Sequence, residues 1–251
     1  MPSYAILGAT GKTGQSIIKV LLQSEENTIH AYCRSKAKLF ALIPEIQHDA
    51  RVAVYEGQTS DIDLLVACLK DTRAAFMAMA PVGNKPGNTL IFDTAQQVVA
   101  AMERLKNRPH LVLLSSSSTD HSFMSSVPSL LRSLLYCANF YIYEDLKRAE
   151  SYLGSHSDIV TTTFVKPGAL SHDEQRGHIL SFSRATSPVS FLDLAAGMIE
   201  IAASPEGDLY HGRAVAVNAA SKDVAFPREA PGVLLQGMLC FLCPWIYPYI
   251  H

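Results

Sequence analysis

A glycine-rich turn near the N-terminus constrains the fold of this chain more than any other feature. The run Gly8 to Gly14 (GATGKTG) follows the short apolar stretch 4–7 and opens an amphipathic segment, 12–22. Glycines let a backbone approach a phosphate without a Cβ in the way, and the N-terminus of the following helix presents unpaired N–H groups. The run therefore predicts a strand, a turn and a helix that bind the pyrophosphate of a dinucleotide rather than an ordinary glycine-rich turn. The residues expected at this site are Gly8, Thr10, Gly11, Lys12, Thr13 and Gly14.

Apolar strand-like runs and helical segments alternate along the rest of the chain, which is typical of a parallel sheet with crossover helices. The expected fold class is therefore α/β, with a Rossmann-type doubly wound parallel sheet and a small C-terminal substrate-side region. A length of 251 residues suits a single domain, with 1–170 as the NAD(P)-binding core and 171–251 as substrate-side insertions, last strand and apolar C-terminal segment. Strands are predicted at 4–7, 29–33, 52–55, 74–79, 111–114, 160–165 and 214–217, shorter ones at 179–182 and 189–191, and helices at 12–22, 36–43, 62–68, 89–105, 138–153 and 192–203.

Charge and cysteine content exclude several classes of protein. The formal net charge of -2 gives no excess of basic groups for a nucleic-acid backbone, so we expect no nucleic-acid partner. The five cysteines are odd in number and widely spread, which favours a reducing, cytoplasmic location. Cys240 and Cys243 form a lone C-x-x-C motif without a second pair of ligands, and we therefore predict no metal site.

The C-terminal run 233–250 has 18 residues without a formal charge, a length at which a membrane span has to be considered. Gly237, Pro244 and Pro248 disfavour a continuous spanning helix. Three alternatives stay open: packing onto the protein's own body, a homodimer interface, and peripheral membrane contact. In the first case its aromatic side chains could roof an apolar pocket for an aromatic small-molecule substrate. These side chains are Phe241, Trp245, Tyr247 and Tyr249.

Two basic residues follow the second predicted strand, where a site for NAD(H) usually has an acidic residue on the ribose. Arg34 and Lys38 could instead hold a 2′-phosphate, which favours NADP(H) over NAD(H) as the cofactor. A solvated basic start of a helix is the alternative interpretation, and it does not exclude the first.

Further along the chain, two groups of residues have the chemistry for reducing a carbonyl. Tyr143 and Lys147 are four residues apart, hence on one face of a predicted helix, and a lysine beside a tyrosine helps the phenolate to form. A serine run, 115–118, ends the fifth predicted strand, and ligands bind at the carboxyl ends of strands in open α/β sheets. Tyr143 would donate a proton to the substrate oxygen, and Ser117 or Ser118 would orient the carbonyl. Asp173 and Glu174, beside His172, are alternative acid/base groups for an isomerase or dehydratase.

With these motifs, the chain resembles the atypical or extended branch of the short-chain dehydrogenase/reductase superfamily. The resemblance rests on the glycine run, the serine run, and Tyr143 with Lys147, and it extends to Lys166-Pro167-Gly168, which is similar to the family's Pro-Gly turn near the nicotinamide. The segment 190–195 is similar to one in NmrA-like members, and the chain looks closest to the averufin-oxidase-like oxidoreductases of fungal polyketide clusters.

This resemblance implies a role for each candidate residue. Lys147 would hold the cofactor ribose, and Pro167 would lie beside the nicotinamide. Many relatives have an acidic residue after the glycine that stands at Gly57 here, so the adenine contact is expected from Gln58 instead.

We therefore expect an NADP(H)-dependent oxidoreductase of secondary metabolism that acts on a carbonyl or quinone-like group of an apolar, aromatic, polyketide-type small molecule. The first alternative is a non-catalytic regulator of NmrA type that binds NADP(H) and reports the redox state to a protein partner. The second is an isomerase or dehydratase on the same fold.

Overall fold

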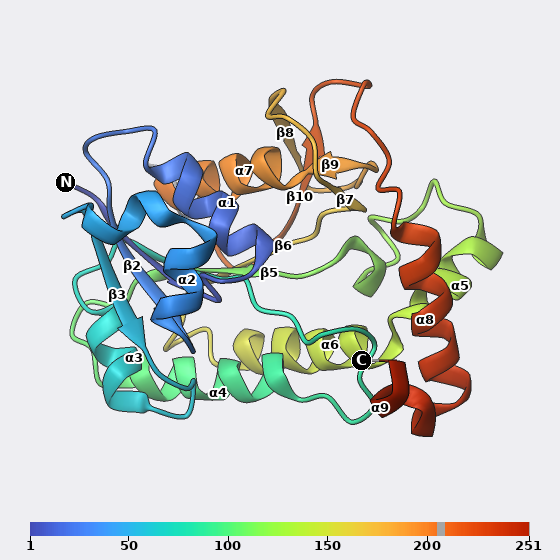
Figure 1. Cartoon of the computed structure of the whole chain (residues 1–251), viewed down its shortest axis with the longest axis horizontal. Helices are drawn as coiled ribbons and strands as arrows, with labels where there is room; N and C mark the ends of the chain where they lie inside the picture. The colour runs from blue at the N-terminus through green and yellow to red at the C-terminus, as the bar shows by residue number, and fades with distance from the viewer. Residues whose placement is uncertain (205–208, 251) are drawn as a thin grey trace.

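A computed structural model of the chain describes residues 1–204 and 209–250. Its centre is an eight-stranded sheet with the strand order β3-β2-β1-β4-β5-β6-β10-β8 (Figure 1). All neighbouring strands in this sheet are parallel except β10 and β8. The strands are β1 (Ser3–Leu7), β2 (Thr28–Cys33), β3 (Val52–Glu56), β4 (Ala74–Met77), β5 (His110–Leu114), β6 (Thr162–Val165), β8 (His178–Ser181) and β10 (Ala214–Ala219), and a separate parallel pair contains β7 (Leu170–Ser171) and β9 (Val189–Ser190).

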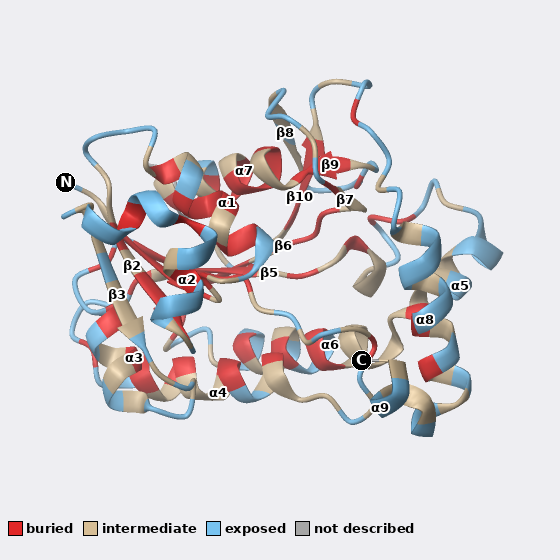
Figure 2. Cartoon of the chain, viewed as in Figure 1, coloured by how far each residue is buried: buried red, intermediate tan, exposed pale blue. Residues whose placement is uncertain are grey.

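Helices cover both faces of the sheet. Successive side chains of a strand point to opposite faces of the sheet, and the sheet has a cluster of buried apolar residues on each face. In β1, Ile6 belongs to the first cluster, and Ala5 and Leu7 belong to the second. The first cluster is completed by α1 (Lys12–Leu21), α2 (Lys36–Leu42), the short η1 (Pro44–His48) and α7 (Phe191–Ala203). The second is completed by α3 (Ile62–Leu69), α4 (Leu90–Glu103) and α6 (Phe140–Ser155). Figure 2 shows the buried residues concentrated on the strands and on the helix faces toward them.

The Rossmann-type fold expected from the sequence is confirmed, with one correction. The sheet is not wholly parallel, since β8, in the region expected on the substrate side, pairs antiparallel with β10 along 216–219. The division of the chain at residue 170 stays a prediction.

Helix boundaries differ from the prediction at two points. The predicted helix 138–153 is divided at Asn139, which caps both α5 (Ser129–Ala138) and α6, and α5 itself was not predicted. Phe191, expected at the end of a strand, begins α7, because the Ser190 hydroxyl accepts a hydrogen bond from the Asp193 N–H (3.0 Å) and thereby caps the helix.

The apolar C-terminal run folds into helices that lie beside α5, away from the main sheet (Figure 1). These are α8 (Ala230–Leu242), the short η4 (Pro244–Ile246) and α9 (Tyr247–Ile250). In the described part of the chain, no helix combines the length and apolar character needed to span a bilayer. Leu235, Leu242 and Trp245 are exposed, so a homodimer or peripheral membrane contact here stays a prediction.

The buried side-chain amide of Asn84 connects α8 to the rest of the protein by hydrogen bonds. The Asn84 side chain, 2% exposed, donates to the Gly237 carbonyl (3.0 Å) and accepts from the Tyr141 N–H (2.9 Å) at the start of α6. At Gly237 the helix backbone lies so close to α5 that a Cβ would collide with the Ala138 carbonyl oxygen. Glycine at 237 is therefore a packing requirement.

Gly237→Ala should lower the free energy of unfolding by about 1–3 kcal/mol, because the added methyl group pushes α8 away from α5. Gly232→Ala in the same helix is the matched control, since a Cβ at Gly232 meets open space. There alanine should leave stability unchanged or raise it by up to about 1 kcal/mol. Urea unfolding measures both, and equal midpoints for the two variants would contradict the close packing.

Candidate functional site

The turn between β1 and α1 is built from close backbone contacts. Gly8 has φ +96°, a conformation that side chains disfavour, and a Cβ there would lie 2.8 Å from the Ala78 carbonyl oxygen. A Cβ on Gly14 would collide with the Gly8 carbonyl oxygen. Gly11 caps α1 without a side-chain hydrogen bond, so the first N–H groups of the helix remain available to an anion. This cradle fits the pyrophosphate expected from the sequence, with Thr10 in the turn and Lys12 and Thr13 at the start of α1.

The turn after β2 presents the two expected cations to solvent. Ser35 caps α2 by accepting a hydrogen bond from the Lys38 N–H (3.2 Å), which fixes the backbone of this turn. Arg34 and Lys38 are exposed, and the structure gives neither an ion pair within residues 1–204 and 209–250. Both are therefore available to a phosphate.

Gln58 lies at the neighbouring strand end. Its side chain is exposed, and its carbonyl accepts a hydrogen bond from the Tyr32 hydroxyl (2.7 Å). Burial, with a smaller contribution from Asp61, raises the pKa of Tyr32 to about 12, so this phenol stays a donor. The hydrogen bond holds Gln58 beside the end of β2, where an adenine contact is expected.

A cavity of about 760 Å³ lies between the serine turn, α6 and the C-terminal helix α8. Its wall is mostly apolar, and its charged lining residues are Lys12, Arg184 and Glu229. Ser116, Ser117, Ser118 and Tyr143 also line it. The cavity thus joins residues from the glycine turn, the end of β5, α6 and the C-terminal region. Its apolar wall includes Met124, Val127, Leu131, Leu135, Phe191, Phe226, Val233 and Leu234.

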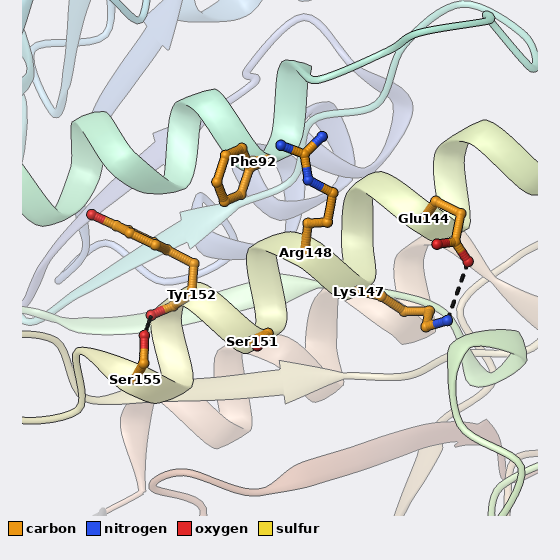
Figure 3. A pocket seen from close by; sticks show the side chains of 7 residues that line it. All are labelled: Phe92, Glu144, Lys147, Arg148, Ser151, Tyr152 and Ser155. Atoms are coloured by element: carbon orange, nitrogen blue, oxygen red, sulfur yellow. Dashed lines mark hydrogen bonds and ion pairs between the residues drawn. The ribbon is translucent and has the colours of Figure 1, made fainter.

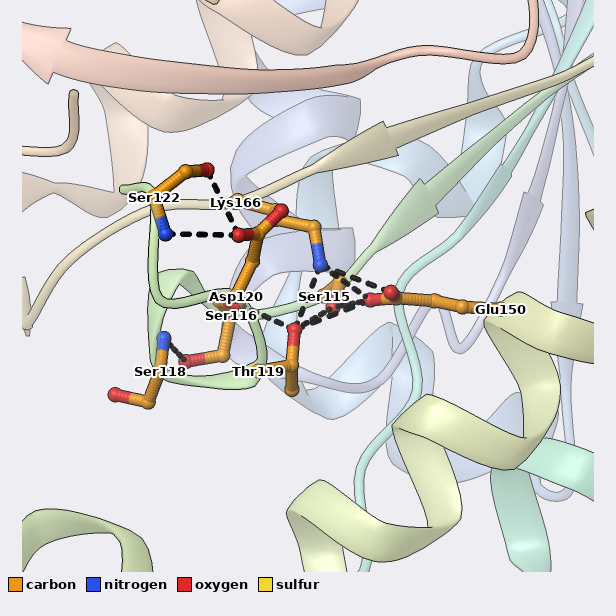
Figure 4. Close-up of polar contacts among 8 residues, drawn as sticks. All are labelled: Ser115, Ser116, Ser118, Thr119, Asp120, Ser122, Glu150 and Lys166. Atoms are coloured by element: carbon orange, nitrogen blue, oxygen red, sulfur yellow. Dashed lines mark hydrogen bonds and ion pairs between the residues drawn. The ribbon is translucent and has the colours of Figure 1, made fainter. Parts of the chain in front are cut away.

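The four consecutive serines have different surroundings. Ser115 donates to the Glu150 carboxylate, and the Ser116 hydroxyl caps η2 (Ser117–Thr119) by accepting from the Ser118 N–H (3.2 Å). Ser117 is buried and its hydroxyl contacts the Met124 sulfur (3.4 Å). The Ser118 hydroxyl has no hydrogen-bond partner among the described residues, and in Figure 4 it points away from the polar cluster around Lys166. Of the two serines expected to orient a carbonyl, Ser118 is the one with a free hydroxyl.

Tyr143 and Lys147 lie on the same helix but line different pockets. The half-buried Tyr143 lines the large cavity, with its ring centroid 5.5 Å from that of Tyr136 on α5. The Lys147 ammonium instead contacts Glu144 (3.1 Å) and donates to the Tyr136 hydroxyl (3.2 Å). These hydrogen bonds, the one to Tyr136 first, raise the pKa of Lys147. Lys147 thus lines a second, open pocket of about 490 Å³ with Phe92, Arg148 and Tyr152 (Figure 3).

Of the two residues that the sequence points to at the end of β6, Pro167 is buried behind the serine turn and Gly168 lines the cavity. The Pro167 carbonyl accepts a hydrogen bond from the Ser117 N–H (3.0 Å) and so ties the β6 end to the serine turn. Gly168 and Ser187 pack together at the cavity wall.

Sequence reasoning missed several polar residues that hold the site together. Asp145, 1% exposed, accepts hydrogen bonds from the N–H groups of Ile91 (2.8 Å) and Phe92 (3.1 Å), and so fixes α6 against the N-terminus of α4. Burial raises the pKa of Asp145, its hydrogen bonds to backbone opposing this. The only signal in the sequence was an acidic residue between Tyr143 and Lys147.

The alternative acid/base residues lie at the edge of the site. The Asp173 carboxylate accepts from the N–H groups of Ala225 (2.9 Å) and Glu174 (2.8 Å), and these bonds lower its pKa. His172 lies 2.6 Å from the Lys12 ammonium nitrogen. Neither Asp173 nor Glu174 lines the cavity, and no group of three potential metal ligands occurs in the described part of the chain.

Comparisons with known proteins identify the family of this chain. A family model described as NAD(P)H-binding matches residues 8–205. The oxidoreductase stcQ of Emericella nidulans is 44% identical over 260 residues, covering 100% of this chain and 94% of the relative. The oxidoreductase aflX of Aspergillus parasiticus is 45% identical over 254 residues, covering 99% and 95%.

Solved structures support the fold. A short-chain dehydrogenase/reductase of Veillonella parvula in complex with NADP has a TM-score of 0.70 at 20% identity, covering 90% of this chain and 99% of that one. The expected family resemblance is therefore confirmed, and the chain is a Rossmann-fold oxidoreductase that belongs to the NAD(P)H-binding family.

Proposed function

We propose that this protein is an NADP(H)-dependent oxidoreductase that reduces a carbonyl or quinone-like group on an apolar, aromatic, polyketide-type molecule of secondary metabolism. The observation that carries the proposal is the cavity that brings Ser118 and Tyr143 together beside Lys12 of the glycine turn. When bound, the cofactor supplies the hydride. The residues of the chain bind, orient the substrate and provide the proton.

The turns after β1 and β2 support the choice of cofactor. Gly8, Gly11 and Gly14 leave the backbone of the first turn open to a pyrophosphate, and Arg34 and Lys38 present two cations at the next strand end. A ribose with a 2′-phosphate pairs with these cations, whereas an unmodified ribose would gain little from them. We therefore infer a preference for NADP(H), with Gln58 on the adenine side and Pro167 near the nicotinamide.

The cavity supports the choice of substrate. Its mostly apolar wall suits a flat aromatic molecule, and the serine turn and Tyr143 contribute hydroxyl groups to the same cavity. In this proposal the Ser118 hydroxyl donates a hydrogen bond to the substrate oxygen, and the Tyr143 phenol donates the proton that the oxygen takes up. We therefore assign the proton transfer to Tyr143. Lys147 could hold the cofactor ribose only by leaving Glu144 and Tyr136, and this role, expected from the sequence, stays a prediction.

We also propose a cytoplasmic location, because all five cysteines are free thiols in the structure and a reducing compartment keeps them so.

The overall proposal is tested by incubating the purified protein with NADPH and a panel of quinones and aryl ketones. Loss of NADPH absorbance with formation of a reduced product is the expected result. Binding of NADPH without turnover would point to a redox-sensing regulator, and a changed product without net oxidation of NADPH would point to an isomerase or dehydratase.

Replacing Arg34 or Lys38 by alanine should weaken NADPH binding about tenfold or more, because each variant loses a charge-assisted hydrogen bond to the phosphate. The affinity for NADH should change little. Lys36→Ala, in the same turn, is the matched control, since the Lys36 ammonium lies over the Phe40 ring, 5.4 Å from its centroid. Titration calorimetry with both cofactors measures this, and an equal loss of NADPH and NADH affinity would contradict the preference.

Tyr143→Phe should lower turnover about a hundredfold or more while NADPH affinity is retained, because the proton donor is lost but the binding surface is not. Ser118→Ala should also lower turnover, and more than Ser117→Ala does. Tyr152→Phe on the same helix is the control, because Tyr152 lines the other pocket. Steady-state kinetics decide the matter: normal turnover in Tyr143→Phe would remove the tyrosine from the mechanism.

A further inference from the structure

An ion pair between a buried lysine and a partly buried glutamate lies behind the serine turn, outside the lining of the cavity. Lys166, at the end of β6, is 2% exposed, and its ammonium donates to both carboxylate oxygens of Glu150 on α6 (2.9 Å each) and to the Thr119 hydroxyl (2.7 Å). Figure 4 shows these contacts meeting at the Lys166 nitrogen. The three protons of the ammonium are thereby directed at three protein oxygens.

The same pair continues into the backbone of the serine turn. The Thr119 hydroxyl donates to the Ser116 carbonyl (2.8 Å), and the Ser115 hydroxyl donates to the Glu150 carboxylate. The Lys166 charge is thus connected through Thr119 to the backbone that precedes Ser118. Four elements meet here: the end of β5, the η2 turn, the end of β6 and helix α6.

Stability alone is a weak explanation for this arrangement. Removing an ammonium and a carboxylate from water costs free energy that their attraction only partly offsets, and apolar side chains of similar volume often stabilise a protein equally well. What apolar side chains cannot do is direct hydrogen bonds at chosen oxygens. The arrangement therefore favours a role in geometry.

The helix that carries Glu150 also carries Tyr143. The two residues are seven positions apart, which is about two helical turns and places them on the same side of α6. A pair that holds the serine turn against Glu150 therefore also sets the distance between the serine turn and Tyr143.

We propose that Lys166 and Glu150 are positioning residues that hold the Ser118 hydroxyl in register with the Tyr143 phenol. This inference rests on the proposed function, because it gives Ser118 and Tyr143 a shared substrate oxygen. A displacement of about 1 Å in such a site can lower the rate about a hundredfold, and a fixed serine turn therefore justifies the cost of burying the Lys166 charge.

The test is the double variant Lys166→Met/Glu150→Met, which removes both charges and leaves neither unpaired. Its thermal unfolding and NADPH affinity should stay close to those of the parent, while turnover of a quinone falls about tenfold to a hundredfold. The control Arg104→Met/Asp63→Met removes an exposed ion pair between α3 and the end of α4 and should leave turnover unchanged.

A double-mutant cycle with Ser118→Ala separates positioning from general structural damage. If the pair acts through Ser118, the Lys166/Glu150 variant should lower turnover in the parent and have little further effect once Ser118 is alanine. Additive losses, or an unchanged turnover in the Lys166/Glu150 variant, overturn the inference.

The affinity for a quinone in the presence of NADP⁺ is measured for the same variants, because this binding measurement needs no turnover. Normal turnover in Ser118→Ala itself would refute the role of the serine in the proposed function. A loss in Ser118→Ala without a loss in the Lys166/Glu150 variant would refute only the positioning role. If the Met pair fails to fold, Lys166→Gln/Glu150→Gln, which also leaves no charge unpaired, replaces it in the same cycle with the same expected non-additivity.

Discussion

The backbone contact between the start of α1 and the turn after β1 is the constraint on which the rest of the site depends. Because neither Gly8 nor Gly14 has a side chain, the first turn of the helix rests directly on the Gly8 carbonyl, and its N–H groups open onto the carboxyl edge of the sheet. The chain leaves β2, β5 and β6 at this same edge. Arg34, Ser118 and Pro167 therefore all lie at this edge of the sheet, although the sequence separates them widely.

Local sequence patterns were sufficient to predict most of this framework. The strands of the parallel part of the sheet are short apolar runs bounded by turn residues, and α1 and α7 carry apolar residues at helical spacing. Each of these patterns can be recognised within a short stretch of the sequence. The antiparallel pairing of β8 was not predictable in this way. Ile179 of that strand is exposed, and its direction is set by the partner β10, which lies more than thirty residues further along the chain.

The same limit explains the difference between Tyr143 and Lys147. Spacing on a helix predicts which residues share a face, but the partners of each side chain decide where its polar end lies. Here Tyr136 provides the decisive partner, and it belongs to α5, a helix whose packing against the distant α8 is part of what stabilises it. Without α5, a reader of the sequence has no reason to place the Lys147 ammonium anywhere but beside the tyrosine.

The polar residues that the sequence did not single out share one property: each is buried and has its partners in another part of the chain. Asn84 joins the loop before α4 to α8, Asp145 joins α6 to α4, and Lys166 joins β6 to α6 and the serine turn. Because an unsatisfied buried polar group is costly, each of these side chains favours a single relative placement of the elements it connects. An apolar wall alone would tolerate small shifts of α6 and α8 with little change in free energy. The shape of the cavity is therefore determined by these few polar contacts, while apolar side chains provide most of its wall.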